Sequence, residues 1–278
     1  MAPPTLTFDA LRARHRALLI DAYGVLVDSE GALPGAADAI AALERDGQPW
    51  LLVTNDASRS PETNARRLQG FGIPVEPERV LSSGALLAPW FAREGLVGAR
   101  CVVLGSPDSH DYVLAAGGVI VAPRHDAEVE AVVIADDSGF AFKETMNAVL
   151  SLIVRAFERG APPALVLANP DLIYPAGAGR YGFTAGTMAA MIEGALAVRF
   201  PEHPPRFTPL GKPSPVIFEE ALSKLGTRDA VMLGDQLHTD IAGANGVGIA
   251  SALLLSGVTT REAALRSSTV PTYLVERL

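Results

Sequence analysis

Short, continuously apolar runs recur along this chain, and each of them ends at a polar residue or a glycine. Runs this short are typical of strands that are buried on both faces, as in parallel sheets. Segments with helix signals lie between them: Pro34 opens a stretch that reaches Gly47, and Ser214-Pro215 opens one that reaches Gly226. Strands that alternate with helices predict an α/β fold with a Rossmann-like parallel sheet. The apolar runs are 18–21, 50–55, 102–104, 132–135, 165–168, 231–235 and 252–255.

The charge balance and hydropathy of the chain exclude several classes of partner. The formal net charge is −8, and no block of Lys or Arg stands out. Nucleic acids favour a basic face, so we expect no nucleic-acid partner. The longest uncharged stretch, 241–260, contains four glycines and is predicted to be a loop followed by a strand. With no signal-peptide pattern at the start of the chain, we expect a cytoplasmic protein with no membrane partner.

Polar residues stand at the ends of three of the predicted strands. Asp21 ends the first run, Thr54 and Asn55 end the second, and Asp235 ends the sixth. In parallel α/β sheets the site lies beyond the carboxyl ends of the strands. A carboxylate in a small-residue turn can attack an electrophile while neighbouring backbone N–H groups, such as that of Ala22, hold an anion. Each residue taken alone also fits an ordinary turn or cap.

Two further segments carry charge beside a glycine. Lys212 follows Gly211 and precedes a predicted helix, where a lysine can neutralise a phosphoryl oxygen. Asp235 and Asp240, five residues apart after a buried strand, can bind a hard cation and position a ligand. They fit a pair of turn and cap aspartates equally well. His238, between them, could line the entrance of the site.

Taken in chain order, these motifs resemble those of the haloacid dehalogenase superfamily. They are D-x-x-G-V from Asp21, T-N at Thr54, G-K-P around Lys212 and G-D-x-x-x-T-D ending at Asp240. The segment Ala168-Asn169-Pro170-Asp171 looks like the NagD-like branch, subclass IIA, which includes p-nitrophenyl, phosphoglycolate and pyridoxal phosphate phosphatases. The resemblance covers nearly the whole chain, and as a set the motifs are specific.

The spacing of the motifs indicates where a cap domain is inserted. Only 32 residues separate Asp21 from Thr54, too few for a cap between the first two motifs. By contrast, 156 residues separate Asn55 from Lys212, and they include strands and helices of their own. We therefore expect a separate α/β cap domain in this interval. The resemblance implies the boundaries: a hydrolase core over 1–96 and 207–278, and a cap over 97–206.

The resemblance also implies an activity, namely hydrolysis of a small phosphorylated metabolite through an aspartyl-phosphate on Asp21. Lys212 assists at the catalytic centre, and it holds the transferred phosphoryl group together with Thr54, Asn55 and the backbone of Ala22. Phosphoryl transfer is mostly positioning and charge neutralisation, which a cation and a lysine provide.

A magnesium ion is the implied cofactor. Its implied ligands are the carboxylates of Asp21 and Asp235 and the main-chain carbonyl of Tyr23. Asp240 supports the loop from behind the ligands, and Asp171 of the cap faces the substrate. The same resemblance implies a homodimer formed through the cap.

Residue 23 departs from the pattern of the family's phosphatases, which place a second aspartate two residues after the nucleophile. That aspartate protonates the leaving group and then activates water. A phenol, with a usual pKa near ~10, does not readily accept a proton from water at neutral pH. Loss of a general acid–base typically costs on the order of 10²–10⁴ in rate. With Tyr23 at this position, we expect slow turnover, and Asp28, Asp56 or a substrate group is a candidate for the missing base.

Two alternatives stay open at this stage. Asp-x-Tyr-Gly also resembles the first motif of the 2-haloacid dehalogenases, which displace halide without a metal. The Asp235–Asp240 pair and the position of the cap count against that assignment. The second alternative is a protein that binds a phosphorylated metabolite without catalysis, because Tyr23 replaces the general acid–base.

Overall fold

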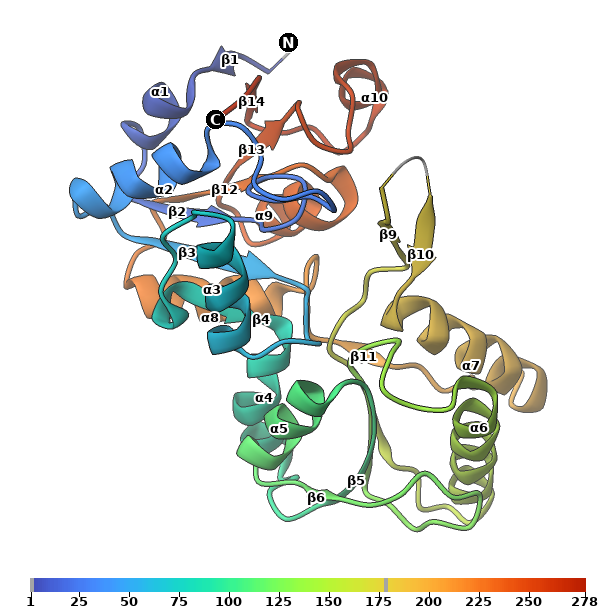
Figure 1. Cartoon of the computed structure of the whole chain (residues 1–278). Helices are drawn as coiled ribbons and strands as arrows, with labels where there is room; N and C mark the ends of the chain where they lie inside the picture. Colours follow the sequence, from blue (N-terminus) through green and yellow to red (C-terminus); the bar gives the residue numbers. More distant parts are fainter. Residues whose placement is uncertain (1–2, 178–179) are drawn as a thin grey trace. The chain divides into compact units, whose positions relative to one another are not determined.

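In a computed structural model the chain divides into two compact units. The structure describes residues 3–177 and 180–278 (Figure 1). The first unit comprises the chain up to residue 54, then 61–82 and 212–278, and the second comprises 55–60 and 83–211. The boundaries expected for the cap, 97 and 206, lie inside the long segment of the second unit. Residues 83–96, expected in the core, pack within the second unit.

The described residues of the first unit form a seven-stranded sheet in the order β1-β14-β13-β12-β2-β3-β4. Every neighbouring pair in it is parallel. The apolar runs near 18, 50, 231 and 252 form its central strands, so the predicted parallel α/β fold is confirmed. The strands are β1 (Thr5–Leu6), β2 (Ala17–Ile20), β3 (Trp50–Thr54), β4 (Val80–Ser82), β12 (Ala230–Gly234), β13 (Ala250–Leu254) and β14 (Tyr273–Val275).

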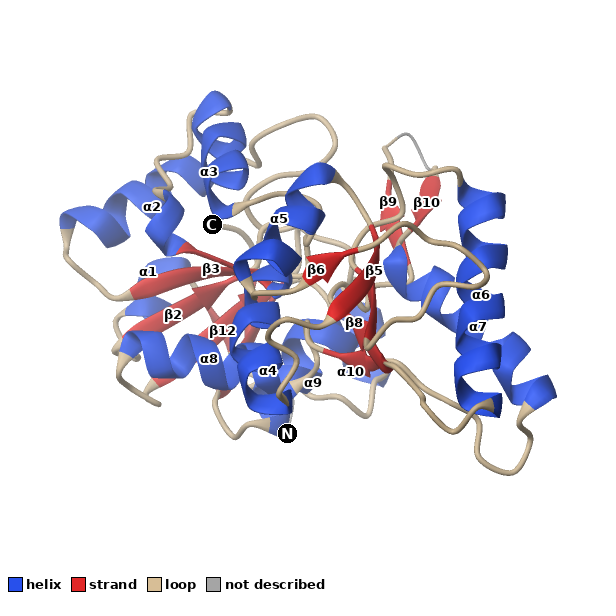
Figure 2. Cartoon of the chain, turned by 90° about the horizontal axis from the view of Figure 1, so that it is seen from below, coloured by secondary structure: helices blue, strands red, loops and turns tan. Residues whose placement is uncertain are grey.

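Helices cover both faces of this sheet (Figure 2). Leu43 of α2 joins Leu18 and Leu52 of the sheet in one buried cluster, whereas α8 contacts β3 from the other face. Both helices match predicted segments. The helices of this unit are α1 (Phe8–Arg12), α2 (Ala36–Arg45), α3 (Pro61–Gly70), η1 (Pro77–Arg79), α8 (Pro215–Leu225), the π-helical turn η3 (Leu237–Ile241), α9 (Ala242–Gly246) and α10 (Arg261–Arg266).

The stretch 241–260 differs from the predicted loop and strand, because the short helix α9 precedes β13. Two glycines in five residues give α9 a weak helix propensity. Tertiary packing offsets this weakness: a Cβ on Gly243 would lie 2.2 Å from Cε2 of Phe218, so only a glycine lets α9 approach α8 this closely. None of the helices in the described part of the chain is long and apolar enough to cross a bilayer.

The second unit is the cap, and it contains its own parallel sheet, separate from the sheet of the first unit. Its described strands run in the order β11-β8-β7-β5-β6. They are β5 (Arg100–Leu104), β6 (Val119–Ile120), β7 (Ala131–Ile134), β8 (Ala164–Leu167) and β11 (Thr208–Pro209). One face of the sheet packs against α6 (Phe142–Glu158) and α7 (Ala185–Arg199), as their shared buried cluster shows. The other helices are η2 (Ser83–Leu86), α4 (Leu87–Glu94) and α5 (Pro107–Ala115).

A small antiparallel pair, β9 (Ile173–Pro175) and β10 (Tyr181–Phe183), is absent from the sequence prediction. The strands have three residues each, and Ile173, Tyr181 and Phe183 are exposed. No buried apolar run marks such strands, which explains why hydropathy did not reveal them.

Candidate active site

The candidate site of the first unit begins at the centre of its sheet. The chain passes from β2 outward to β3 and β4, and later returns on the other side of β2 as β12, β13 and β14. The order of the strands therefore reverses between β12 and β2, which is where parallel α/β sheets bind ligands. Ile20 lies in register with Leu233 on one side and Leu52 on the other. Asp21, Asp235 and Thr54 consequently emerge at the same edge.

Lys212 joins two of the predicted aspartates. Its Nζ lies 2.6 Å from Oδ1 of Asp21 and 2.7 Å from Oδ1 of Asp240. The exposed fractions are 2% for Lys212, 6% for Asp21 and 0% for Asp240. Ion pairs buried this deeply are retained only where their geometry satisfies both charges. The lysine thus connects residues that lie 191 and 28 positions apart in the sequence.

Asp240 reaches this position through the local backbone after β12. The turn η3 is π-helical, and the N–H groups of both Asp240 and Ile241 donate to the carbonyl of Gln236. The Asp240 side chain folds back, so that its Oδ2 accepts from the N–H of Gln236. A Cβ on Gly234 would lie 2.2 Å from Cγ of Asp240. Glycine at 234 is therefore what lets the carboxylate return to the strand end.

Asp235 is fully buried, and its side chain is closely surrounded by backbone. The N–H of Val258 donates to its Oδ2 at 2.8 Å. Gly24 has a φ of +86°, and a Cβ there would lie 2.1 Å from the same oxygen. The other oxygen, Oδ1, is buried without a hydrogen-bond partner among the residues that the structure describes. A buried carboxylate oxygen with no donor is the group that a divalent cation binds.

The electrostatics of the cluster point the same way. Burial raises the pKa of Asp21 well above its usual value, although the charge of Lys212 opposes the shift. Burial and then the charge of Asp240 raise the pKa of Asp235 to about 7. Burial disfavours the charged form of Lys212, but Asp21 and Asp240 outweigh it and the pKa of Lys212 rises. The cluster thus contains three carboxylates and one lysine, and a divalent cation would neutralise the excess charge.

The three carboxylates are close enough to share an ion. One oxygen each from Asp21, Asp235 and Asp240 lies within 4.8 Å of the others. The residues differ, however, in what their oxygens already contact. Both oxygens of Asp240 have protein partners, Lys212 and the N–H of Gln236, whereas Oδ1 of Asp235 has none in the described chain. The residues present therefore fit a cation held mainly by Asp21 and Asp235.

The remaining predicted site residues of the first unit are neighbours in sequence of these aspartates or lie at the end of β3. The N–H of Ala22 donates to Oδ1 of Asp21 at 2.8 Å. Tyr23 is half-buried, and it forms an isolated bridge with Val27. Thr54 is buried at the end of β3. His238 is exposed on η3.

Asn55 and Asp171 both belong to the second unit. Nδ2 of Asn55 donates to Oδ1 of Asp171 at 2.9 Å. A Cβ on Gly211 would lie 2.5 Å from Oδ1 of Asn55, so the amide also fills the space beside this glycine. The sequence predicts a phosphate ligand at Asn55 and a substrate-facing residue at Asp171, and in the structure these two side chains contact each other.

The two aspartates considered as replacement bases both hold turns. Oδ1 of Asp28 accepts from the N–H groups of Glu30 and Gly31. Asp56 accepts from the N–H and hydroxyl of Ser58, and its Oδ2 lies 2.8 Å from Arg59. Both carboxylates are thus engaged in the local structure of their own loops.

The sequence did not predict that residues 257–259 belong to the site. Residues 257–259 wrap Asp235: besides the bond from Val258, the N–H of Thr259 donates to the Asp235 carbonyl. A Cβ on Gly257 would lie 2.3 Å from the Cβ of Asp235. The available signal was the position of Gly257, just beyond the predicted strand at 252–255. Strand β13 adjoins β12, so its end faces the same edge.

Two family models match this chain: haloacid dehalogenase-like hydrolase over residues 18–118 and HAD-hydrolase-like over 209–278. The acid sugar phosphatase of Staphylococcus saprophyticus is 30% identical over 266 residues, which cover 95% of this chain and 95% of that protein. The chain belongs to the haloacid dehalogenase-like hydrolases.

Solved structures agree with this membership. A possible sugar phosphatase of Cytophaga hutchinsonii superposes on this hydrolase with a TM-score of 0.86 and 29% identity, covering 99% of this chain and 98% of that one. A glycerol phosphate phosphatase of Mycobacterium tuberculosis, in complex with magnesium, has a TM-score of 0.78 and 28% identity over 97% of this chain and 76% of that one. Structural neighbours that include a p-nitrophenyl phosphatase place this hydrolase near the NagD-like branch.

Proposed function

We propose that this hydrolase removes the phosphoryl group from a small phosphorylated metabolite, and that Asp21 is its nucleophile. The observation that carries the proposal is the buried cluster of Asp21, Lys212, Asp235 and Asp240, in which Oδ1 of Asp235 has no partner among the described residues. The names of the relatives, a sugar phosphatase and a glycerol phosphate phosphatase, support a phosphate monoester as substrate. The chain is then a phosphoric monoester hydrolase.

The hydrogen bonds of Asp21 distinguish the roles of its two carboxylate oxygens. Ala22 N–H and Lys212 Nζ both donate to Oδ1, so Oδ2 is the oxygen that attacks phosphorus. The bond from phosphorus to the leaving oxygen breaks as the Asp21–phosphorus bond forms, and the leaving oxygen takes a proton from solvent. Water then attacks phosphorus, the Asp21–phosphorus bond breaks, and inorganic phosphate leaves with the carboxylate restored. Lys212 and Thr54 hold the negative oxygens of the transferred group in this scheme, and Ala22 as a further phosphate donor stays a prediction.

Magnesium is the proposed cofactor. Asp21, Asp235 and the main-chain carbonyl of Tyr23 would hold it, and it would supply charge neutralisation and orientation of the phosphoryl oxygens. Asp240, whose oxygens are occupied by Lys212 and Gln236, positions the lysine and the strand end. The magnesium complex of the Mycobacterium tuberculosis relative supports this cofactor.

The second unit is the proposed source of substrate specificity. Within that unit Asn55 and Asp171 contact each other, and Asn55 as a phosphate ligand and Asp171 as a substrate contact stay predictions. The expected cap boundaries, 97 and 206, and a homodimer through the cap stay predictions.

We predict magnesium-dependent hydrolysis in a panel of sugar phosphates, glycerol phosphate and p-nitrophenyl phosphate. Phosphate release is measured with excess Mg²⁺ and again after EDTA. Without the metal, the excess negative charge of the carboxylates should prevent the site from binding the anionic phosphate ester. EDTA should abolish the release, and added Mg²⁺ should restore it. Halide release from a 2-haloacid that survives EDTA would instead support a dehalogenase. Tight phosphate-ester binding with no release from any compound would support a binding protein.

We also predict that Mg²⁺ stabilises the folded protein through Asp235. Bound cation at about 100-fold above Kd stabilises by about 2.7 kcal/mol, so thermal unfolding of the wild type should shift upward by several degrees. Asp235→Asn should abolish most of this shift, and without metal it should be at least as stable as the wild type because one buried charge is removed. Asp38→Asn, at an exposed position of α2, is the matched control and should keep the full shift. An equal shift in Asp235→Asn would contradict the assigned ligand.

A further inference from the structure

The six residues that follow Thr54 take their conformation from the second unit. Residues 55–60 join β3 to α3, and both of those elements belong to the first unit. The segment itself nevertheless packs within the second unit. We call residues 55–60 the connecting segment. Because Asn55 is bonded directly to Thr54, the contacts that hold this segment also constrain the peptide next to a proposed phosphate ligand.

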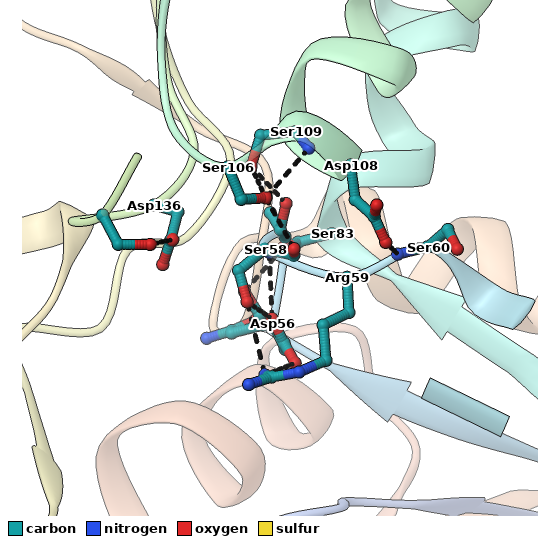
Figure 3. Close-up of polar contacts among 12 residues, drawn as sticks. Asp56, Ser58, Arg59, Ser60, Ser83, Ser106, Asp108, Ser109 and Asp136 are labelled. Carbon is teal, nitrogen blue, oxygen red and sulfur yellow. Dashed lines mark hydrogen bonds and ion pairs between the residues drawn. The ribbon is translucent and has the colours of Figure 1, made fainter. Parts of the chain in front are cut away.

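The start of helix α5 supplies three of these contacts (Figure 3). Ser106 caps α5 by accepting from the N–H of Ser109, and its hydroxyl donates to the carbonyl of Ser58 at 2.6 Å. The hydroxyl of Ser109 donates to the carbonyl of Ala57 at 2.8 Å. Asp108, in the first turn, accepts from the N–H of a segment residue at 2.7 Å. The helix therefore binds the main chain of the segment.

Two further hydroxyls complete the set. Tyr112, one turn along α5, donates from its hydroxyl to the carbonyl of Arg59 at 2.7 Å. Ser83, at the start of η2, donates to the carbonyl of Asn55 at 2.9 Å. Four backbone carbonyls of the segment, those of residues 55, 57, 58 and 59, thus accept hydrogen bonds from side-chain hydroxyls.

The hydroxyls are built into the fold of the second unit. Ser83 and Ser109 are 0% exposed and Tyr112 is 9% exposed. Buried hydroxyls cost free energy unless they are hydrogen-bonded. Glycines make room for them: a Cβ on Gly105 would lie 2.6 Å from Oγ of Ser109, and one on Gly84 would lie 2.4 Å from the ring of Tyr112. The hydroxyl of Ser109 also contacts the hydroxyl of Ser106.

The segment is also braced from within. Asp56 accepts from Ser58 and pairs with Arg59 at 2.8 Å, as Figure 3 shows. This internal pairing leaves the carbonyls turned toward the hydroxyls of α5 and η2. The segment is consequently held on both sides, by its own side chains and by those of the second unit.

We propose that Ser109 and Tyr112 are positioning residues for phosphoryl transfer, acting through the connecting segment on Thr54 and Asn55. The inference rests on the proposed function. Phosphoryl transfer depends on placing donors around the transferred group, and small displacements of those donors lower the rate steeply. The two hydroxyls touch neither substrate nor metal in this scheme. They fix the backbone on which the donors stand.

The test uses Tyr112→Phe and Ser109→Ala in the full-length protein, each of which removes one hydroxyl and keeps the rest of the side chain. We expect each to lower kcat for the best substrate of the panel by roughly 3- to 10-fold, the equivalent of one hydrogen bond, with KM nearly unchanged. Amide hydrogen exchange in residues 55–60 should become faster. Ser151→Ala is the matched control, because Ser151 also donates from a helix to a backbone carbonyl but lies in α6. It should change neither readout.

A double-mutant cycle with Thr54→Ala separates positioning from general weakening of the fold. If Tyr112 acts through Thr54, the effect of Tyr112→Phe on kcat should shrink in the Thr54→Ala background, whereas independent effects would multiply. Faster exchange in the segment with unchanged kcat would overturn the positioning role while leaving the phosphatase intact. A wild-type protein with no Asp21-dependent turnover would instead refute the proposed function, and the positioning role with it.

Discussion

Asp21→Asn should lower magnesium-dependent phosphate release by on the order of 10⁴-fold or more, because an amide cannot form the acyl-phosphate. The substitution keeps the shape of the side chain and can still accept the bonds that Ala22 and Lys212 donate to Oδ1. Lys212 keeps Asp240 as a charged partner in this variant. The measurement is the initial rate with the best substrate of the panel, with circular dichroism to verify folding.

Asp28→Asn is the matched control for this experiment. Asp28 lies in the same loop after β2, but its Oδ1 accepts from the backbone of Glu30 and Gly31, and an asparagine oxygen can accept the same bonds. The control should keep most of the wild-type rate. Equal rates in wild type and Asp21→Asn would remove Asp21 from the mechanism, and a large loss in Asp28→Asn would return Asp28 to consideration as a base.

The core of the fold was predictable because burial on both faces leaves a plain trace in the sequence. Trp50-Leu51-Leu52-Val53 reads as a strand since every one of its side chains is buried in the sheet. The proximity of Asp21 and Asp235 follows from the rule that the carboxyl ends of parallel strands lie at one edge of the sheet. That rule needs only the order of the elements, and the order is visible in the chain.

Other features depend on contacts that have no local signature. Residues 55–60 lie between two elements of the first unit, and nothing in Ser58 reveals that the second unit holds its backbone. Ser109 and Tyr112 read as ordinary helix residues until the carbonyls that they bind are located. Gly257 likewise has a visible role only when β13 is placed beside β12. Such contacts join positions far apart in sequence, and a single sequence does not encode them as a pattern.

The family resemblance implies a general acid–base at position 23, where this chain has no carboxylate. Position 23 carries a tyrosine, and both carboxylates that could have replaced an aspartate there are committed to turns. Asp28 binds its own loop, and Asp56 is paired with Arg59. With no free carboxylate among these candidates, protonation of the leaving group and activation of water should limit the reaction.

Tyr23→Asp should therefore raise the hydrolysis of an alkyl phosphate such as glycerol phosphate by on the order of 10²–10⁴-fold. The gain should be smaller for p-nitrophenyl phosphate, whose leaving group needs little protonation. Only the main-chain carbonyl of residue 23 is proposed as a metal ligand, so the magnesium response should be retained. Single-turnover kinetics measure the chemical step directly and exclude product release as the cause of any change.

Tyr23→Phe distinguishes the phenol from the aspartate that it replaces. It keeps the ring and removes only the hydroxyl, so a phenol that donates a proton to the leaving oxygen would make this variant slower than wild type on the alkyl ester. We expect Tyr23→Phe to change the rate by less than about 3-fold, since the weak acidity of a phenol gives it little catalytic effect at neutral pH. If Tyr23→Asp leaves alkyl phosphate hydrolysis unchanged, residue 23 does not limit the rate, and the base must come from the substrate itself.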